Sequence, residues 1–313
     1  MTDKQINKWL RRRFSIVGWV LIGYYLLMNL MVLLEVLLGD LVWMLQLYGG
    51  NPGAYGAAET AWGYIMAITI GLILLHAWKG SDFWREEVLA RKGRMKPGAF
   101  LCLLILGMGA QMVNSFWITG LETLLNPFGL SAIGILESVS GSADTLSMFL
   151  YASILAPVGE ELLFRGYVLR SLKPFGTRFA VWGSAILFGL FHGNLLQTPY
   201  AVLMGLLLGY VTVEYSIGWS IMIHLFNNLV LADLLTRLTV SWSDMAYGML
   251  NMMLFGGSFL VAVGILVRNR KNIRDYRNHE WIDKRVVKWF FLNSGVIILS
   301  VIALVNMISL LFI

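Results

Sequence analysis

The sequence has few cysteines, few charges and few histidines, and each shortage narrows the range of folds and sites open to it. Cys102 is the only cysteine, which excludes disulfides within the chain and cysteine-rich metal sites. Charged residues make up only 13% of the 313 residues, against about 25% in soluble domains. Hydrophobic residues make up 58%. Because the charges fall in short runs between long apolar segments, the composition indicates a multi-spanning membrane protein.

Long apolar segments recur along the whole chain and define its expected fold. The first follows Arg13 and is longer than the roughly 7–15 apolar residues of a signal peptide, so it is expected to remain as an uncleaved span. Since a span needs about 20 apolar residues, we predict an all-α polytopic transmembrane helical bundle of about 8–9 spans. Eight spans plus a re-entrant segment remain open, because the segments between 146 and 216 are short and carry polar residues. The nine candidate spans are residues 14–38, 60–78, 99–125, 146–166, 179–196, 199–215, 218–236, 249–267 and 289–312.

Basic residues alternate between the loops of this bundle. Lys and Arg crowd the N-terminus, the segment after the second candidate span and residues 268–288, whereas residues 40–58 and 126–145 contain neither. Loops rich in Lys and Arg are typically cytoplasmic, so the N-terminus is predicted inside and, with nine spans, the C-terminus outside. The net charge of +6 therefore indicates orientation in a lipid bilayer and no nucleic-acid partner. Short loops and the lack of organelle signals favour a bacterial cell membrane.

Two adjacent carboxylates, Glu160 and Glu161, lie inside an otherwise apolar stretch. A charged side chain at membrane depth costs roughly 2.5–3.5 kcal/mol on insertion scales, so such a pair is by default a functional site. Glu161 and Arg165 are four residues apart and can form an ion pair on one helical face, which leaves Glu160 available. Pro157 predicts a kink or a new helix start, and a new start would place Glu160 in a first turn, where the helix dipole favours a carboxylate. The alternative is a structural ion pair near the membrane surface, with Glu160 reaching water.

Further polar residues follow in the same hydrophobic half. His192 ends an apolar run, and a lone histidine there is more often a packing residue than a ligand. His224 and Asn228 are four apart within another apolar segment, so an imidazole and an amide can face one point. The other histidines carry less weight. His76 ends the second span and is expected at the membrane interface, and His279 opens a near miss to the His-Glu-x-x-His zinc motif, with aspartate in place of the second histidine.

Taken in order, these motifs resemble those of a known family. The pattern is similar to that of the CPBP family, the CAAX proteases and bacteriocin-processing enzymes, also called the Abi or type II CAAX prenyl endopeptidase family. The resemblance covers roughly residues 145–235, under a third of the chain. The residues that carry it are Glu160, Glu161, Arg165, Phe188, His192, His224 and Asn228.

The resemblance implies an intramembrane endopeptidase that acts on a peptide or membrane-protein substrate. It implies that Glu160 and His192 activate a water molecule. It also implies that His224 and Asn228 stabilise the tetrahedral oxyanion, a role in which each donor is worth about 10²–10³ in rate. The supporting residues are Glu161 and Arg165.

The need for a metal stays open at this point. A zinc ion held by Glu160, His192 and His224 is chemically possible. A mechanism without any cofactor is favoured, because Asn228 lies one turn from His224 and amides are uncommon zinc ligands. In that mechanism His224 is a hydrogen-bond donor and not a ligand.

The motifs divide the chain into three parts: N-terminal transmembrane helices (1–145), a CPBP-like catalytic core (146–235), and C-terminal helices with a basic cytoplasmic loop (236–313). Two other classes of function are weighed against the protease. A non-catalytic membrane scaffold that regulates a partner enzyme is expected to have lost a motif residue, and none is lost. A transporter that uses Glu160 as a proton relay is expected to show inverted repeats, which the sequence does not display.

Overall fold

The computed structural model describes residues 2–44, 60–132, 145–278 and 282–312, and within these ranges the chain is helical and contains no strand. Seven helices of the described ranges are long and apolar enough to cross a membrane. This confirms the expected all-α polytopic bundle, with a slightly smaller number of spans than predicted. The seven are Asp3–Leu41, Trp62–Lys79, Pro97–Phe128, Leu146–Phe175, Ile217–Thr239, Asp244–Arg268 and Ser294–Phe312.

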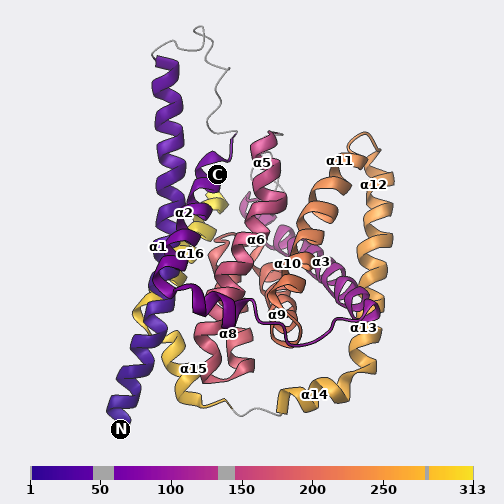
Figure 1. Ribbon diagram of the computed structural model, residues 1–313. Coiled ribbons are helices and arrows are strands. Elements are labelled where there is room, and N and C mark those ends of the chain that lie inside the picture. Colours follow the sequence, from indigo (N-terminus) through magenta and orange to yellow (C-terminus); the bar gives the residue numbers. More distant parts are fainter. Residues whose placement is uncertain (1, 45–59, 133–144, 279–281, 313) are drawn as a thin grey trace.

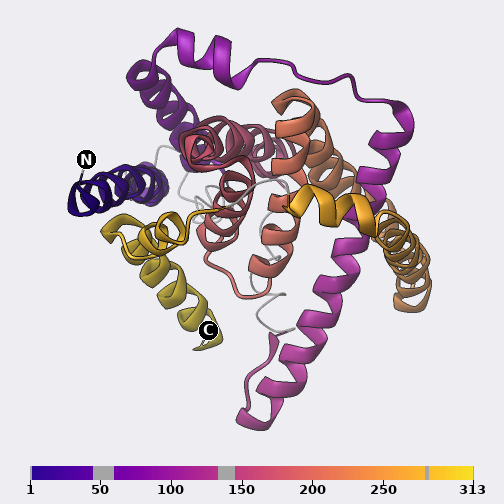
Figure 2. The same cartoon turned by 90° about the horizontal axis from the view of Figure 1, so that it is seen from below.

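Two shorter helices account for the difference from the predicted count. Helices α8 (Thr177–Phe191) and α9 (Thr198–Glu214) have 15 and 17 residues. Helices of this length reach roughly 22–26 Å, less than the hydrocarbon core of about 30 Å. They pack against each other in the middle of the bundle (Figures 1 and 2), and most residues of α8 are buried. The predicted spans 179–196 and 199–215 are therefore short interior helices.

One side of the bundle is built on α1 (Asp3–Met44), which packs along α2 (Trp62–Lys79), α15 (Lys284–Phe291) and α16 (Ser294–Ser309) (Figure 1). Helix α1 has 42 residues. It is therefore roughly 63 Å long, about twice the hydrocarbon thickness, and part of it must extend beyond the apolar layer. The N-terminal end of α1 and the C-terminal end of α16 lie at opposite ends of the bundle (Figure 1).

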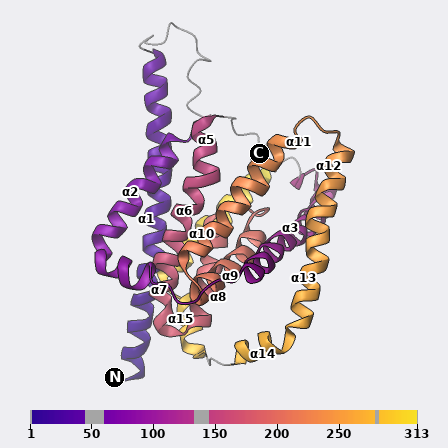
Figure 3. The same ribbon diagram turned by 45° about the vertical axis from the view of Figure 1, so that its right-hand side comes forward.

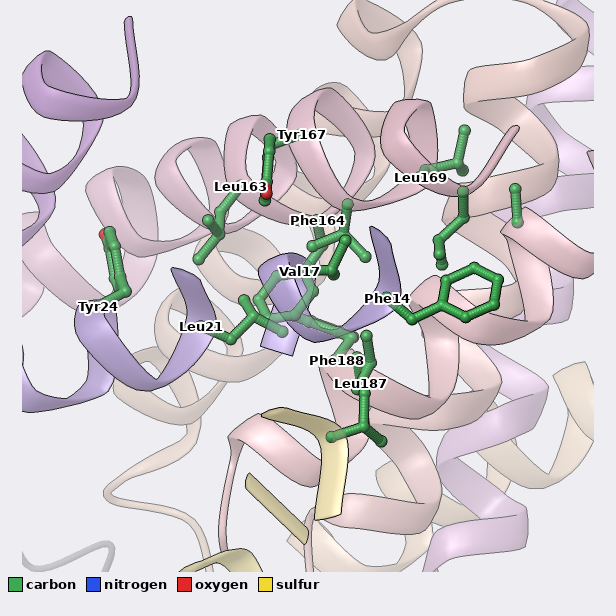
Figure 4. Close-up of a cluster of buried hydrophobic side chains, with 14 of the residues drawn as sticks. Phe14, Val17, Leu21, Tyr24, Leu163, Phe164, Tyr167, Leu169, Leu187 and Phe188 are labelled. Atoms are coloured by element: carbon green, nitrogen blue, oxygen red, sulfur yellow. The ribbon is translucent and has the colours of Figure 1, made fainter. Parts of the chain in front are cut away.

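The main hydrophobic core forms where α1 meets the helices that carry the glutamate pair and His192 (Figure 4). The ring of Phe164 lies 5.1 Å from that of Phe188 and 5.5 Å from that of Phe191. Within lipid, such packing stabilises helix association by dispersion contacts more than by exclusion of water. The core fixes the positions of the motif-bearing helices. Its labelled members are Phe14, Val17, Leu21, Tyr24, Leu163, Phe164, Tyr167, Leu169, Leu187 and Phe188.

The opposite side is built on α3 (Pro97–Leu125), which packs against α9 and α13 (Gly257–Arg268). A second, smaller core lies there around Leu103, Met204 and Leu208. Helix α12 (Asp244–Asn251) continues into α13 at the outer edge of the bundle (Figures 2 and 3). Only 6% of the apolar window of this span is buried, so it is a lipid-facing outer helix.

π-helical turns interrupt the spans that carry Glu160 and Asn228. One ends at Leu155, directly before the helix that contains Pro157, so the predicted break becomes a local widening and the helix continues through the proline. π-helical turns within α-helices are frequent at functional sites. The first span comprises α5 (Leu146–Leu150), the π-turn Tyr151–Leu155, α6 (Ala156–Glu161), the π-turn Leu162–Val168, α7 (Leu169–Leu172) and Lys173–Phe175. The second comprises α10 (Ile217–Leu225), the π-turn Phe226–Leu234 and α11 (Leu235–Thr239). The remaining described segments are Phe83–Val88, Asn126–Phe128, Met252–Gly256, α14 (Arg270–Asn278) and Leu310–Phe312.

Candidate active site

Glu161 and Arg165 form the ion pair that their spacing predicts. Arg165 Nη1 lies 2.8 Å from Glu161 Oε1, and both side chains are fully buried. Arg165 also donates from Nη2 to the Gly205 carbonyl of α9 at 3.3 Å, and its guanidinium lies 4.4 Å from the ring centre of Phe188 in α8. A buried charge is tolerated only when it is paired in this way. The arginine is therefore held by three helices at once.

The Glu161 carboxylate accepts three hydrogen bonds from other side chains. It accepts from Arg165, from the hydroxyl of Ser220 and from Nδ1 of His224, the last at 3.0 Å. Ser220 and His224 lie one turn apart on α10, and both are buried. Glu161 is therefore not placed to take a proton from a substrate water. Ser220 was not predicted from the sequence, although its spacing of four from His224 is a signal that could have found it.

Glu160 has different surroundings, although it is the next residue along the chain. Its side chain is 27% exposed, and the nearest basic atom is Nε2 of His224, 3.7 Å from Oε2. Within the described part of the chain its carboxylate makes no hydrogen bond. The phenol groups of Tyr24 and Tyr151 lie within electrostatic range of it. Glu160 thus offers a carboxylate on a polar, partly open side of the helix.

His224 lies between the two glutamates. Its Nδ1–H donates to Glu161 at 3.0 Å, and its Nε2 faces Glu160 at 3.7 Å. The carboxylate at Nδ1 fixes the orientation of the ring and its tautomer. In the neutral ring Nε2 is then an acceptor, and only the doubly protonated ring can donate from Nε2. The predicted role of His224 as an oxyanion donor therefore requires its protonated form.

His192 follows directly after the last residue of α8. Its Nδ1–H donates to the Phe188 carbonyl at 2.8 Å, which leaves Nε2 as the acceptor of the neutral ring. The next residue, Gly193, has φ = 56°, a left-handed conformation that side chains with a Cβ rarely adopt. A Cβ on Gly193 would also approach the amide of Asn306 to 3.1 Å. The glycine therefore lets the chain turn sharply and keeps His192 at the helix end.

Asn228 is oriented by a chain of hydrogen bonds. Tyr200 of α9 donates from its hydroxyl to Asn227 Oδ1 at 2.5 Å, and Asn227 Nδ2 donates to Asn228 Oδ1 at 3.0 Å. Asn228 in turn donates from Nδ2 to the Ala152 carbonyl at 3.1 Å. One amide hydrogen of Asn228 is therefore used, and the other is available. Neither Tyr200 nor Asn227 was selected from the sequence, because their pairing joins two different helices.

The predicted site residues are brought into one region, but not all of them touch. The ring of Phe188 lies edge-on to both imidazoles, 4.8 Å from His192 and 5.9 Å from His224. No hydrogen bond or ion pair joins His192 to Glu160 in the described ranges. These residues likewise contain no group of three or more His, Cys, Asp or Glu that could hold a metal ion. The zinc set considered above therefore does not converge in this arrangement.

A family model now gives an independent comparison for the same region. The model described as type II CAAX prenyl endopeptidase Rce1-like matches residues 142–230. We refer to this matched part of the chain as the Rce1-like domain. The match includes the glutamate pair, both histidines and Asn228, and it agrees with the extent of the resemblance seen in the sequence. Searches of curated proteins and of solved structures found no match.

Glu35 and His76 lie outside the Rce1-like domain, and their surroundings indicate structural roles. Glu35 of α1 is buried, and it accepts hydrogen bonds from the Thr60 hydroxyl and from the backbone N–H groups of Trp62 (3.2 Å) and Gly63 (2.7 Å). It therefore caps the start of α2, whose first N–H groups have no partner within the helix. His76 is exposed at the end of α2, where its ring lies 6.0 Å from that of Trp84. The motif that begins at His279 falls outside the described residues.

Proposed function

We propose that this chain is an intramembrane endopeptidase in which Glu160 is the general base. The observation that carries the proposal is the contrast between two neighbouring carboxylates. Glu161 is fully buried and holds Arg165, Ser220 and His224, whereas Glu160 is 27% exposed and forms no hydrogen bond within the described chain. A carboxylate that is near water and accepts no hydrogen bond is suited to accept a proton. The Rce1-like match, by its name an endopeptidase family, supports the same reaction.

In the proposed reaction, Glu160 accepts a proton from a water molecule while the water oxygen attacks the carbonyl carbon of a peptide bond. The carbonyl π electrons move to oxygen, and a tetrahedral oxyanion forms. His192 can accept a second hydrogen bond from the same water, because its Nδ1–H is already used by the Phe188 carbonyl. General base catalysis of this kind is worth about 10²–10⁴ in rate.

Two donors are available for the oxyanion. Protonated His224 donates from Nε2, and Asn228 donates the amide hydrogen that Ala152 does not use. When the intermediate collapses, the C–N bond breaks and Glu160 returns its proton to the leaving amine. Removal of one oxyanion donor typically costs about 10²–10³ in rate. Every proton in this cycle is carried by residues of the chain, and no bound metal is required.

The test is cleavage of a peptide library by purified full-length protein in detergent, read by mass spectrometry. We expect cleavage products with the wild type and none with Glu160→Gln. Glu86→Gln is the matched control, since Glu86 is an exposed carboxylate on another helix. Products formed equally by wild type and Glu160→Gln would remove Glu160 as the base. Absence of products from a wild type that stays folded would favour the non-catalytic scaffold.

A further inference from the structure

A basic pocket lies where the start of α1 meets the corner between α15 and α16, and neither residue of the glutamate pair lines it. It has a volume of about 670 Å³. Four of its nine lining residues are cationic, and no Asp or Glu lines it. Among the described residues, no carboxylate pairs with these four cations. The lining residues are Lys4, Asn7, Lys8, Arg11, Arg12, Ser15, Trp289, Asn293 and Ser294.

The floor of the pocket is held by contacts between the two ends of the chain. Trp289 donates from Nε1 to Asn7 Oδ1 at 2.8 Å, and the hydroxyls of Ser15 and Ser294 lie 2.9 Å apart. Arg11 stacks on the ring of Trp289 at 5.0 Å. Next to these contacts α1 and α16 touch, because a Cβ on Gly18 would meet the backbone of residue 295 at 2.3 Å. The cations are therefore carried on a rigid junction and not on a loose tail.

The pocket lies where the sequence changes from polar to apolar, both along α1 and between α15 and α16. On α1 the basic run ends at Arg13 and the apolar run begins at the buried Phe14. On the other side, the basic helix α15 leads into the apolar helix α16. Such a change marks the membrane surface, and exposed Trp9 and Trp19 fit the interfacial preference of tryptophan. The pocket therefore opens at the level of lipid headgroups.

A second pocket adjoins the first and has two apolar lining residues, Trp9 and Ile16, beside two arginines. It has a volume of about 290 Å³ and is lined by Trp9, Arg12, Arg13 and Ile16. Arg12 lines both pockets, so the first cationic site and the site beside Trp9 and Ile16 share one side chain. A phosphate group with an apolar chain attached matches this pair of pockets, whereas a free anion would use only the first.

We propose that this junction binds an anionic phospholipid, with its phosphate among Lys4, Lys8, Arg11 and Arg12 and the start of an acyl chain beside Trp9 and Ile16. Clusters of basic residues next to a transmembrane helix attract anionic lipids through the same charge interaction. The site is independent of the proposed proteolysis, because none of its residues lies in the Rce1-like domain.

The test is native mass spectrometry of the full-length protein with phosphatidylglycerol, with zwitterionic phosphatidylcholine and with inorganic phosphate. The test variant is Lys8→Gln/Arg12→Gln, since neither side chain takes part in the contacts that hold the floor. The control is Arg91→Gln/Arg94→Gln, which removes the same charge from an exposed basic segment outside the pocket. Thermal unfolding with each additive gives a second readout.

We expect the wild type and the control to bind phosphatidylglycerol more tightly than phosphatidylcholine. The test variant is expected to lose about 25-fold in affinity for phosphatidylglycerol, since each cation near an anionic surface contributes about fivefold. Equal losses of affinity in the test and control variants would show that only the overall charge matters, and they would rule out the pocket as the binding site. Displacement of the lipid by inorganic phosphate, with thermal stabilisation equal to that given by the lipid, would show that the ligand is a soluble anion and not a lipid.

Discussion

Replacement of Glu160 and of Glu161 by glutamine, one at a time, is expected to separate catalysis from stability. The two changes are chemically identical, and the residues are adjacent on one helix. Their side chains differ in exposure, 27% for Glu160 and 0% for Glu161. Glu160→Gln removes a base without breaking a described hydrogen bond. Glu161→Gln removes the charge that compensates the buried guanidinium of Arg165.

The magnitudes follow from these surroundings. Loss of a general base at Glu160 is expected to lower the rate by about 10²–10⁴, equivalent to roughly 2.7–5.5 kcal/mol of barrier. Breaking a buried ion pair at one partner costs about 3–5 kcal/mol of folding free energy. Since the glutamine carbonyl can still accept one hydrogen bond from Arg165, we expect Glu161→Gln to fall near the lower end, about 3 kcal/mol.

The assay compares both variants with wild type in one detergent, by initial cleavage rate and by thermal unfolding. Glu86→Gln, an exposed carboxylate change, is the control for the loss of one negative charge. We expect Glu160→Gln to be inactive and to unfold at the same temperature as the wild type. We expect Glu161→Gln to unfold at a lower temperature than the wild type. A Glu160→Gln protein that cleaves within about tenfold of wild type would refute the base assignment. A stable, inactive Glu161→Gln protein would transfer the catalytic role to Glu161.

Three further outcomes are expected. Tyr200→Phe removes the first of the hydrogen bonds that lead to Asn228. Since one such bond is worth about 0.5–1.5 kcal/mol, the change should lower kcat by up to about tenfold with little change in KM. An unchanged kcat would show that Tyr200 is not a positioning residue. Gly193→Ala forces a Cβ into a left-handed conformation that costs about 1–2 kcal/mol, and it should lower both melting temperature and activity, whereas Gly264→Ala, which meets no atom within 4 Å, should not. Strong chelators should leave cleavage intact; inactivation that zinc restores, with about one zinc per chain lost in His192→Ala, would instead assign a metal mechanism.

Much of the fold follows from local properties of the sequence. Seven long apolar helices lie close to predicted spans, because a backbone in lipid must satisfy its own hydrogen bonds and long apolar runs can do so only as helices. The two shorter helices, α8 and α9, are interior helices and not full spans. Their apolar character made them look like spans, since an apolar segment buried in protein has the same composition as one exposed to lipid.

The functional roles of the candidate site residues stay predictions, and only some of the contacts between them could be predicted from the sequence. The Glu161–Arg165 ion pair was predictable because residues four apart on a helix share a face. The pairing of Glu161 with His224 was not, since 63 residues separate them and they belong to different helices. The same holds for Ser220, Tyr200 and Asn227, whose partners lie across a helix interface.

The sequence by itself determined the helical membrane architecture, the rarity of charge within it and the identity of the motif residues. These properties depend on the transfer of side chains and backbone into lipid and on spacing along one helix, which are local. The tertiary structure decided that Glu161 is occupied while Glu160 is open, that His224 lies between them, and that Asn7 meets Trp289 across 282 positions in the chain. These choices depend on how helices pack against one another, and packing joins residues whose separation in sequence carries no periodic signal.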